Sequence, residues 1–196
     1  MSGRFGASPF RLEGKIAGYP LTTPASYPFS MTITPSKAEV DWLLRQKDPA
    51  VIPFSGPSTL TLTGSGTASD YRLSGAWDLS GADYRYRENL HKPAGISNQL
   101  RFSTRLGNGR TELTDFSYQL PPLEISATAV YRYNDRTPLS FTLATNRFMM
   151  NRGLPYLPGL QKYHPAGSLQ VRLIRVSRPA QPDLQAAGRR ILLQSG

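Results

Sequence analysis

The residue types that most often carry enzyme chemistry are sparse in this sequence. Its two histidines, His91 and His164, lie far apart, and each stands in a context typical of a turn. The carboxylates considered as acids, bases or metal ligands are single residues in expected strands or turns: Glu13, Asp78, Asp83 and Glu124. A zinc site or a Ser/His/Asp triad needs several such groups to converge. The sequence therefore predicts a protein that is not an enzyme, without metal or cofactor.

Two further kinds of site are excluded by composition and spacing. The 196 residues include no cysteine, which excludes disulfides, thiolate nucleophiles and zinc sites of the cysteine type. The segment Gly64-Ser65-Gly66 lacks the Gly-Lys-Ser/Thr that completes a phosphate-binding loop. We interpret it as a hairpin turn.

The chain is strongly basic and interleaves arginine with aromatic residues. Its 23 Lys and Arg against 13 Asp and Glu give a net charge of +10, which attracts phosphate on nucleic acid or anionic lipid. Tyr84-Arg-Tyr86-Arg87 and Tyr131-Arg-Tyr133 could stack on the bases of single-stranded nucleic acid. The same residues are ordinary strand formers with solubilising charge. We favour the second interpretation because no nucleic-acid-binding motif is visible, and nucleic-acid binding stays an alternative.

The elements that would carry these residues are mostly strands, because apolar and polar residues alternate along much of the chain. The expected strands cover residues 10–16, 29–33, 60–63, 71–79, 84–87, 100–106, 111–120, 123–131, 139–143, 167–173 and 191–193. Gly107-Asn108-Gly109 predicts a hairpin turn, and Asn134-Asp135 predicts another turn. With 17 Gly and 17 Pro, the chain is predicted to be mainly β. We expect an antiparallel meander that forms a curved, open, groove-like sheet.

Two short helical insertions interrupt this predicted meander. Ser36 and Glu39 have the spacing of a capping box, Val40 begins the apolar stripe, and Asp48-Pro49 ends the helix. A second helical stretch covers residues 147–163, where Pro155 and Pro158 require it to be short or broken.

The chain also resembles itself at a distance of about 110 residues. Residues 28–33 align with residues 138–143, residues 12–13 with residues 123–124, and Gly56 with Gly167. We therefore predict a β-rich segment over residues 1–176, with two repeats of which the second is incomplete. Residues 177–196 are expected to be a linker and the start of a further strand. Chance similarity among threonine-rich strands is the alternative.

Short motifs in this β-rich region resemble those of a known family. Residues 78–82, a strand with the pattern DL..A, precede the KPAG turn of residues 92–95. Residues 157–169 have the pattern L.P.L..Y...G.L, a short helix leading into a strand. These features resemble the AsmA-like family of bacterial envelope proteins, in particular its YhdP/TamB-type branch. The resemblance covers roughly residues 60–176.

The resemblance implies a fold and a role. AsmA-like proteins are anchored in the inner membrane of Gram-negative bacteria and cross the periplasm as a long open β-sheet with an apolar groove. They are implicated in moving phospholipid towards the outer membrane. This chain is short and contains no apolar run of membrane-spanning length, so we expect one section of such a groove, with any export signal or anchor outside it. Other envelope proteins or flanking repeats of a parent chain are expected as partners.

Alternation predicts which side chains would line the apolar face and hold phospholipid acyl chains. The expected lipid-groove residues are Leu60, Leu62, Tyr71, Leu73, Trp77, Leu79, Leu100, Phe102, Leu123, Ile125, Phe141 and Leu143. Arg72, Arg101 and Arg132 would point outward or lie near headgroups. Trp42 and Trp77 are expected to be packing residues. The alternative is a structural or protein-binding module, a closed β-sandwich whose core is this same face.

Overall fold

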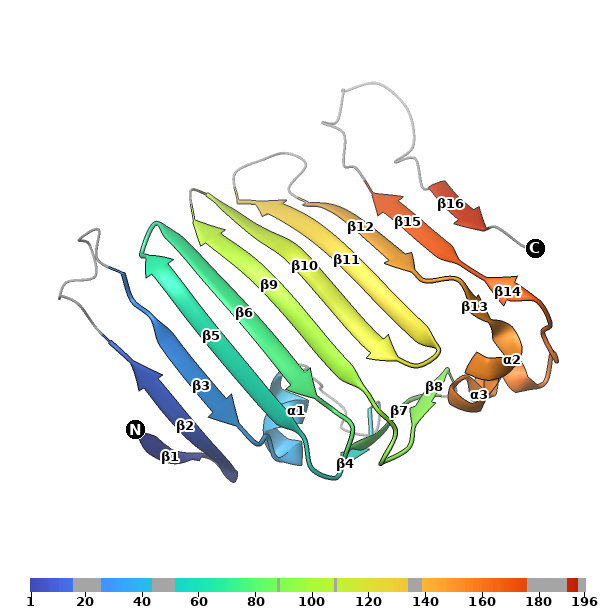
Figure 1. Ribbon diagram of the computed structural model, residues 1–196, viewed down its shortest axis with the longest axis horizontal. Helices are drawn as coiled ribbons and strands as arrows, with labels where there is room; N and C mark the ends of the chain where they lie inside the picture. Colours follow the sequence, from blue (N-terminus) through green and yellow to red (C-terminus); the bar gives the residue numbers. More distant parts are fainter. Residues whose placement is uncertain are drawn as a thin grey trace, which may run out of the picture.

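The computed structural model describes residues 1–15, 26–43, 52–87, 89–107, 109–133, 139–175 and 190–193. Its main feature is one large sheet of eleven strands, in which every neighbouring pair is antiparallel (Figure 1). In spatial order the strands are β1 (Ser2–Phe5), β2 (Ser8–Gly14), β3 (Phe29–Ile33), β5 (Thr59–Thr67), β6 (Asp70–Asp78), β9 (Gln99–Gly107), β10 (Arg110–Leu120), β11 (Leu123–Arg132), β12 (Leu139–Thr145), β15 (Val171–Arg175) and β16 (Arg190–Leu193). The predicted mainly-β open sheet is therefore confirmed.

The central hairpins follow the predicted alternation closely. β9 and β10 pair from Gly107 opposite Arg110 onward, which confirms the hairpin turn predicted at Gly107-Asn108-Gly109, although Asn108 lies outside the described residues. The turn predicted at Gly64-Ser65-Gly66 is wrong. These residues lie inside β5, which continues to Thr67 and pairs with β6 over its whole length. Gly64 makes room for the rings of Phe29 and Tyr71, and Gly66, with a φ of 131°, allows the close approach of the Asp70 backbone.

Both helical insertions are present, and the second is broken as expected. α1 spans Lys37–Leu43, and Ser36 precedes it. Residues 150–161 form three single turns, α2 (Met150–Gly153), η1 (Leu154–Tyr156) and α3 (Pro158–Gln161). A proline stands in the first turn of both η1 and α3. Proline has no backbone N–H, which does not matter in a first turn because the N–H groups there have no partner within the helix. The same proline cannot continue the preceding helix, which therefore ends.

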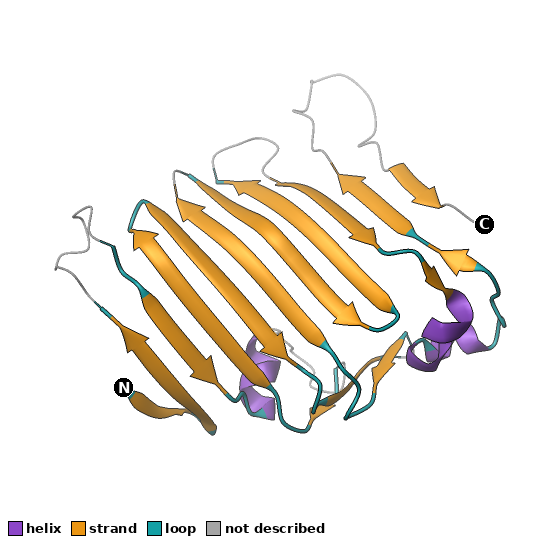
Figure 2. Ribbon diagram, viewed as in Figure 1, coloured by secondary structure: helices purple, strands orange, loops and turns teal. Residues whose placement is uncertain are grey.

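Short strands join the helices at one end of the sheet, and two of them overlap strands predicted from the sequence. β4 (Phe54–Ser55), β7 (Asp83–Tyr86) and β8 (Leu90–Lys92) form a three-stranded sheet, and β13 (Phe148–Met149) pairs with β14 (Ser168–Leu169). His91 thus lies in a strand and not in the turn expected for it. We call α1, β4, β7, β8 and the residues between β6 and β7 the cap. Figure 2 shows the helices and these small strands gathered near the same ends of the long strands.

The buried core lies where the cap meets the sheet. The buried side chains of this cluster are Val40, Phe54, Trp77, Leu79, Ala82 and Tyr84. Beyond this end, the drawn part of the chain has no second layer over the sheet (Figure 2). The accessible surface of 13372 Å² agrees with an open shape, because a compact monomer of 21.7 kDa exposes about 9,200 Å². The alternative of a closed sandwich is therefore wrong for the described part, since the sheet does not close.

Several predicted features lie outside the described residues. These are the end of the first strand at Ile16, the end of the first helix at Asp48-Pro49, the turn at Asn134-Asp135 and the linker from residue 177. The repeat stays a prediction. Two observations are in keeping with it: Gly56 and Gly167 both have positive φ, of 87° and 90°, and each follows a helical insertion. The last strand, β16, pairs with β15.

Candidate functional site

The large sheet has one apolar and one polar face, and the register of the strands determines which side chains lie on the same face. Leu60 lies opposite Trp77, Trp77 opposite Leu100, and Leu100 opposite Tyr118. Directly opposed residues in an antiparallel pair project to the same side, and residues two apart along a strand do so too. We call the side that carries Leu60 the apolar face and the other side the polar face.

Eleven of the twelve residues predicted to line a lipid groove lie on the apolar face, and the twelfth, Leu79, follows the end of β6. They are Leu60, Leu62, Tyr71, Leu73, Trp77, Leu100, Phe102, Leu123, Ile125, Phe141 and Leu143. The register adds further apolar residues to this face, from strands within the set and at both sides of it. They include Phe10, Leu12, Phe29, Met31, Ile33, Leu106, Leu113, Phe116, Tyr118 and Leu173. The apolar face therefore runs across the strands from β2 to β15.

A bulge in β10 keeps this face continuous. The register of β10 shifts by one residue between Leu113 and Phe116 against both of its neighbours. Without the shift, two residues three positions apart would point to opposite faces. With it, Leu113 lies opposite Ala129 and Phe116 opposite Ala127, so both contribute to the apolar face.

Trp77 lies at the capped end of the face, and Leu79 lies just beyond it, in the cap. Leu79 follows β6, donates its backbone N–H to the Asn98 carbonyl at 3.0 Å and is 5% exposed. Trp77 is 8% exposed and lies against the ring of Phe54, with centroids 6.4 Å apart. The expectation that Trp77 packs is confirmed, and these two side chains are covered by the cap rather than open to a ligand. Trp42, by contrast, is 70% exposed and meets the Phe5 ring edge to face, so its assignment as a packing residue was wrong.

A buried lysine holds the cap together. Lys92 in β8 is completely buried, and its Nζ donates hydrogen bonds to three backbone carbonyl oxygens, those of Leu79 (2.6 Å), Ser80 (2.8 Å) and Ala82 (2.7 Å). Burial lowers the pKa of Lys92 from its usual value. The carbonyl oxygens replace the water that the ammonium group loses, and they fix the chain segment that leads from β6 into the cap.

A second polar network joins the cap to the strands beside it. The Tyr84 hydroxyl donates to the Asn98 side chain at 2.8 Å and lies 2.5 Å from the Tyr118 hydroxyl. Asn98, fully buried, donates its side-chain N–H to the Gln119 carbonyl at 2.8 Å. Burial raises the pKa of both tyrosines, so these hydroxyls stay neutral and the network carries no charge.

Glu39 anchors helix α1 to the outer strands. Its carboxylate accepts hydrogen bonds from the Ser36 hydroxyl, the Ser8 hydroxyl (2.7 Å) and the Ala7 N–H (3.2 Å). The predicted capping box is altered, because the Ser36 N–H donates to the Ser8 hydroxyl at 2.7 Å instead of to Glu39. The hydrogen bonds from Ser36 and Ser8 lower the pKa of Glu39 to about 2.

Away from the cap, aromatic rings of the apolar face lie flat over glycines. A Cβ atom added to Gly75 would come within 2.3 Å of the Phe102 ring, and one added to Gly64 within 2.3 Å of the Phe29 ring. The Phe29 and Tyr71 rings are stacked, with centroids 6.4 Å apart. These contacts between neighbours on one face leave its side chains half-buried although no second layer from the described ranges covers them.

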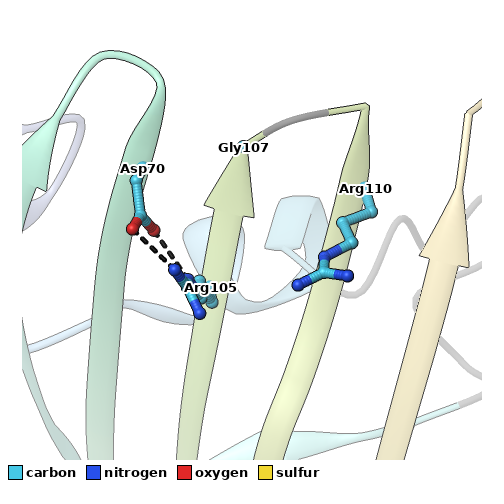
Figure 3. A pocket seen from close by; sticks show the side chains of 4 residues that line it. All are labelled: Asp70, Arg105, Gly107 and Arg110. Carbon is cyan, nitrogen blue, oxygen red and sulfur yellow. Dashed lines mark hydrogen bonds and ion pairs between the residues drawn. The ribbon is translucent and has the colours of Figure 1, made fainter.

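The polar face is built from charged and hydroxyl side chains. Arg72, Arg101 and Arg132 lie on it and are exposed, as expected. At the end far from the cap, both Nε and Nη2 of Arg105 donate to the Asp70 carboxylate at 2.7 Å (Figure 3), which lowers the pKa of Asp70. The hollow lined by Asp70, Arg105, Gly107 and Arg110 holds about 10 Å³, room for roughly one water molecule.

The described residues contain no cluster of three or more side chains suited to hold a metal ion. His91 pairs with Asp83 at 3.4 Å across β7 and β8, and His164 is exposed after α3. Glu13 pairs with Arg11 at 2.6 Å on the polar face, and Glu124 accepts a hydrogen bond from Gln119 there at 3.2 Å. Asp78 accepts from the Ser80 N–H at 2.9 Å. The carboxylates considered from the sequence thus have separate local partners.

The two segments that interleave tyrosine and arginine differ in structure. Tyr84 is buried and hydrogen-bonded, so it has no free ring face for a base, whereas Tyr86 is exposed. Tyr131 and Tyr133 are exposed and pack edge to face, with centroids 5.4 Å apart. Tyr131 lies opposite Thr111, at the end of the strands away from the cap. The two segments therefore do not form one stacking surface.

Comparison with family models, with curated proteins and with solved structures finds no match to this chain. The resemblance to the AsmA-like family therefore stays a prediction, and the physical character of the apolar face carries the functional argument. No helix in the described ranges has the length and apolar character to cross a membrane.

Proposed function

We propose that this chain is a non-catalytic lipid-holding module whose apolar face binds the acyl chains of phospholipid. The observation that carries the proposal is the continuity of that face from β2 to β15, with a second layer at one end only in the part of the chain that the structure describes. In keeping with the resemblance to AsmA-like proteins, we propose that the module forms one section of a periplasmic protein anchored in the inner membrane, and that it contributes to phospholipid transport towards, or homeostasis of, the outer membrane.

The two faces of the sheet give the proposal its chemical logic. A sheet face that exposes this many large apolar side chains is unfavourable in water unless a partner or ligand covers it. Acyl chains suit it because they need no hydrogen bonds, and the strands of the central sheet pair along their length with their neighbours. The polar face keeps its arginines exposed to water, so the ligand would lie on one side of the sheet.

Burial of apolar area supplies the binding energy in this account. Each 100 Å² of apolar surface removed from water contributes about 2.5 kcal/mol. Ordering the lipid and its loss of translational freedom oppose binding by several kcal/mol. An acyl chain that covers Leu62, Phe102 and Ile125 together must cross several strands. A long acyl chain can make contacts over that distance, whereas a small metabolite cannot.

A protein partner is the second candidate, favoured by one observation at the outer edge of the sheet. β1 is an edge strand, all four of its residues are exposed, and Phe5 at its end contacts the exposed Trp42. Edge strands present unpaired backbone groups to which another strand can add. A partner strand paired with β1 would make the chain part of a longer sheet.

The test is lipid recovery from the purified protein by native mass spectrometry and solvent extraction. We expect phospholipid to co-purify with the wild-type chain, and Phe102→Asp and Ile125→Asp to reduce its amount at least fivefold. Ser126→Asp is the matched control, because Ser126 follows Ile125 in β11 but lies exposed on the polar face. Far-UV circular dichroism of each variant checks that the sheet is retained.

Three outcomes would contradict the proposal. The first is a lipid-free wild-type protein that unfolds cooperatively, which would direct attention to a protein partner at β1. The second is equal loss of lipid in Ser126→Asp, which would show that added negative charge and not the apolar face controls recovery. The third is loss of the sheet in both apolar-face variants while Ser126→Asp folds, which would show that the face is a core that protein covers.

A further inference from the structure

A basic cavity lies on the outer side of the cap, away from the apolar face. It has a volume of about 370 Å³ and is lined by Arg85, Arg87, His91, Pro158, Gly159 and Lys162. These residues come from three separate segments, since Arg85 lies in β7, His91 in β8 and Lys162 directly after α3. Folding thus brings cations from distant parts of the sequence around one hollow.

The strand register explains why these side chains point outward. Arg85 lies opposite His91, whereas their neighbours Tyr84 and Lys92 lie opposite each other and are buried in the cap. Successive residues of a strand project to opposite faces. Arg85 and His91 therefore project away from the core, to the side where α3 meets β8.

Among the described residues, the cations of this cavity lack the acidic partners that neutralise arginines elsewhere in the chain. On the large sheet, Arg105 pairs with Asp70, Arg110 with Glu112, and Arg11 with Glu13. Within the described ranges, no ion pair involves Arg85, Arg87 or Lys162, and Asp83 pairs with His91. The residues that line the cavity carry three formal positive charges and no carboxylate.

The conformation of Arg87 is a second unusual feature of the cavity. Arg87 has a φ of 50°, in the left-handed region that residues other than glycine, asparagine and aspartate adopt infrequently. It follows β7, and its guanidinium lies 6.0 Å from the centre of the Tyr86 ring. On the opposite wall, Lys162 Nζ lies 5.0 Å from the centre of the Tyr163 ring. Aromatic rings of this kind hold cations in place without neutralising them.

We propose that this cavity is an anion site that binds a phosphate ester. Two arginines and a lysine from different segments supply the donors that phosphate oxygens accept, and arginine can do so with two hydrogen bonds at once. The volume lies at the lower end of the range for small-molecule pockets and exceeds that of a phosphate group alone. There is thus room for the phosphate and for the alcohol to which it is esterified, such as glycerol.

Two sources of this phosphate share the same chemistry. One is the headgroup of a phospholipid in a membrane surface, and the other is a soluble phosphate ester. The site goes beyond the proposed role of the apolar face and does not depend on it, because the cavity lies on the outer side of the cap. A soluble ester probes the cavity alone, whereas a vesicle probes the headgroup.

The experiment is an NMR titration of the full chain with glycerol 3-phosphate, followed by flotation with phosphatidylglycerol vesicles and with phosphatidylcholine vesicles. The test variant is Arg85→Gln combined with Lys162→Gln. The control variant is Arg72→Gln combined with Arg132→Gln, which removes the same number of positive charges, two, but from the polar face. Ile125→Asp is included because it changes the apolar face and leaves the cavity intact.

We expect the wild-type protein to bind glycerol 3-phosphate or phosphatidylglycerol vesicles saturably. The affinity should be at least tenfold weaker in the Arg85→Gln, Lys162→Gln variant and should change less than twofold in the control variant. Binding of the soluble ester assigns the site to free esters, and binding of the vesicles alone assigns it to headgroups. Equal weakening in both double variants would overturn the proposal in favour of net charge, and so would the absence of saturable binding to either probe. If the Ile125→Asp protein still binds glycerol 3-phosphate but no longer co-purifies with phospholipid, the cavity and the apolar face are separate sites.

Should the double variant fail to fold, the wild-type titration still decides the question. Shifted signals at Arg85, Arg87 and Lys162 support the cavity, whereas shifts spread over the arginines of the polar face contradict it.

Discussion

Replacing the buried Lys92 with methionine tests whether the cap depends on the hydrogen bonds of one ammonium group. Methionine has nearly the same length and shape and keeps the apolar stem, but it removes all three donors. The hydrogen bonds to Leu79, Ser80 and Ala82 are 2.6–2.8 Å long and involve a charged donor. Bonds of this type contribute about 1.5–3 kcal/mol each.

The sum of these contributions is an upper limit for two reasons. The carbonyl of Leu79 also accepts the N–H of Ala82 at 3.0 Å, and the carbonyl of Ser80 accepts that of Gly95 at 2.8 Å. Only the carbonyl of Ala82 loses the one donor that the structure gives it. Methionine also relieves the cost of burying a charge, which amounts to several kcal/mol. We therefore expect Lys92→Met to lower the free energy of unfolding by about 3 kcal/mol.

Urea denaturation followed by circular dichroism measures this change, with Lys15→Met as the control because Lys15 is exposed. The control should alter the free energy of unfolding by less than about 0.5 kcal/mol. In the native wild-type protein, Lys92 should also be the lysine that reacts most slowly with an amine-acetylating reagent. A Lys92→Met protein as stable as the wild type, or fast acetylation of Lys92, would refute the assignment of Lys92 as a buried link in the cap.

Two further predictions concern the sheet and the outer helix. Gly75→Val should lower the free energy of unfolding by about 1–3 kcal/mol in the same assay, because its Cβ would meet the Phe102 ring at 2.3 Å. Ala76→Val is the control, because Ala76 is exposed on the polar face of the same strand, and it should change the free energy of unfolding little. Equal effects of the two substitutions would contradict the packing of Phe102 against Gly75. Because the pKa of Glu39 is lowered from 4.5 to about 2, its contribution to stability is complete above pH 4.5 and is lost as pH falls towards 2. The wild type should therefore lose more stability over that interval than Glu39→Gln, and parallel pH profiles of the two proteins would contradict this.

The sequence was sufficient to predict the long strands because their alternation records a single physical fact, the contrast between two faces of a sheet. Eleven of the twelve proposed face residues share one side for this reason. Leu79 continues the alternation of β6, but the strand ends at Asp78, and Leu79 enters the cap. Alternation also could not reveal the bulge in β10, because a single extra residue changes the spacing of Leu113 and Phe116 without any turn residue to mark it.

Helix α1 and strand β7 were predicted, but the rest of the cap was missed because its features run against the usual behaviour of the residues that form it. β4 and β8 are two and three residues long, too short for a periodic pattern, whereas β7 overlaps the strand predicted at residues 84–87. Lysine is almost never fully buried, so nothing in the sequence marked Lys92 as a core residue. Gly64 and Gly66 were interpreted as turn residues, whereas Gly64 makes room for aromatic rings. Glycine serves both purposes, and only the neighbouring strands decide between them.

The cationic cavity illustrates the same limit for function. Its residues come from β7, β8 and the end of α3, and the sequence signal at hand was the run Tyr84-Arg-Tyr86-Arg87. That run was weighed as a stacking surface. The structure divides it instead, with Tyr84 buried in the cap and Arg85 facing the cavity.

Site-specific photocrosslinking in a bacterial host tests the central claim most directly. A benzophenone amino acid is placed at Phe102 or Phe141 on the apolar face, and at Arg101 or Thr142, their neighbours on the polar face. After irradiation, the purified protein is analysed by mass spectrometry for covalently attached phospholipid. The account predicts attached phospholipid at the two apolar-face positions and little at the other two. Protein adducts without lipid at the apolar face, or equal lipid attachment at all four positions, would contradict it.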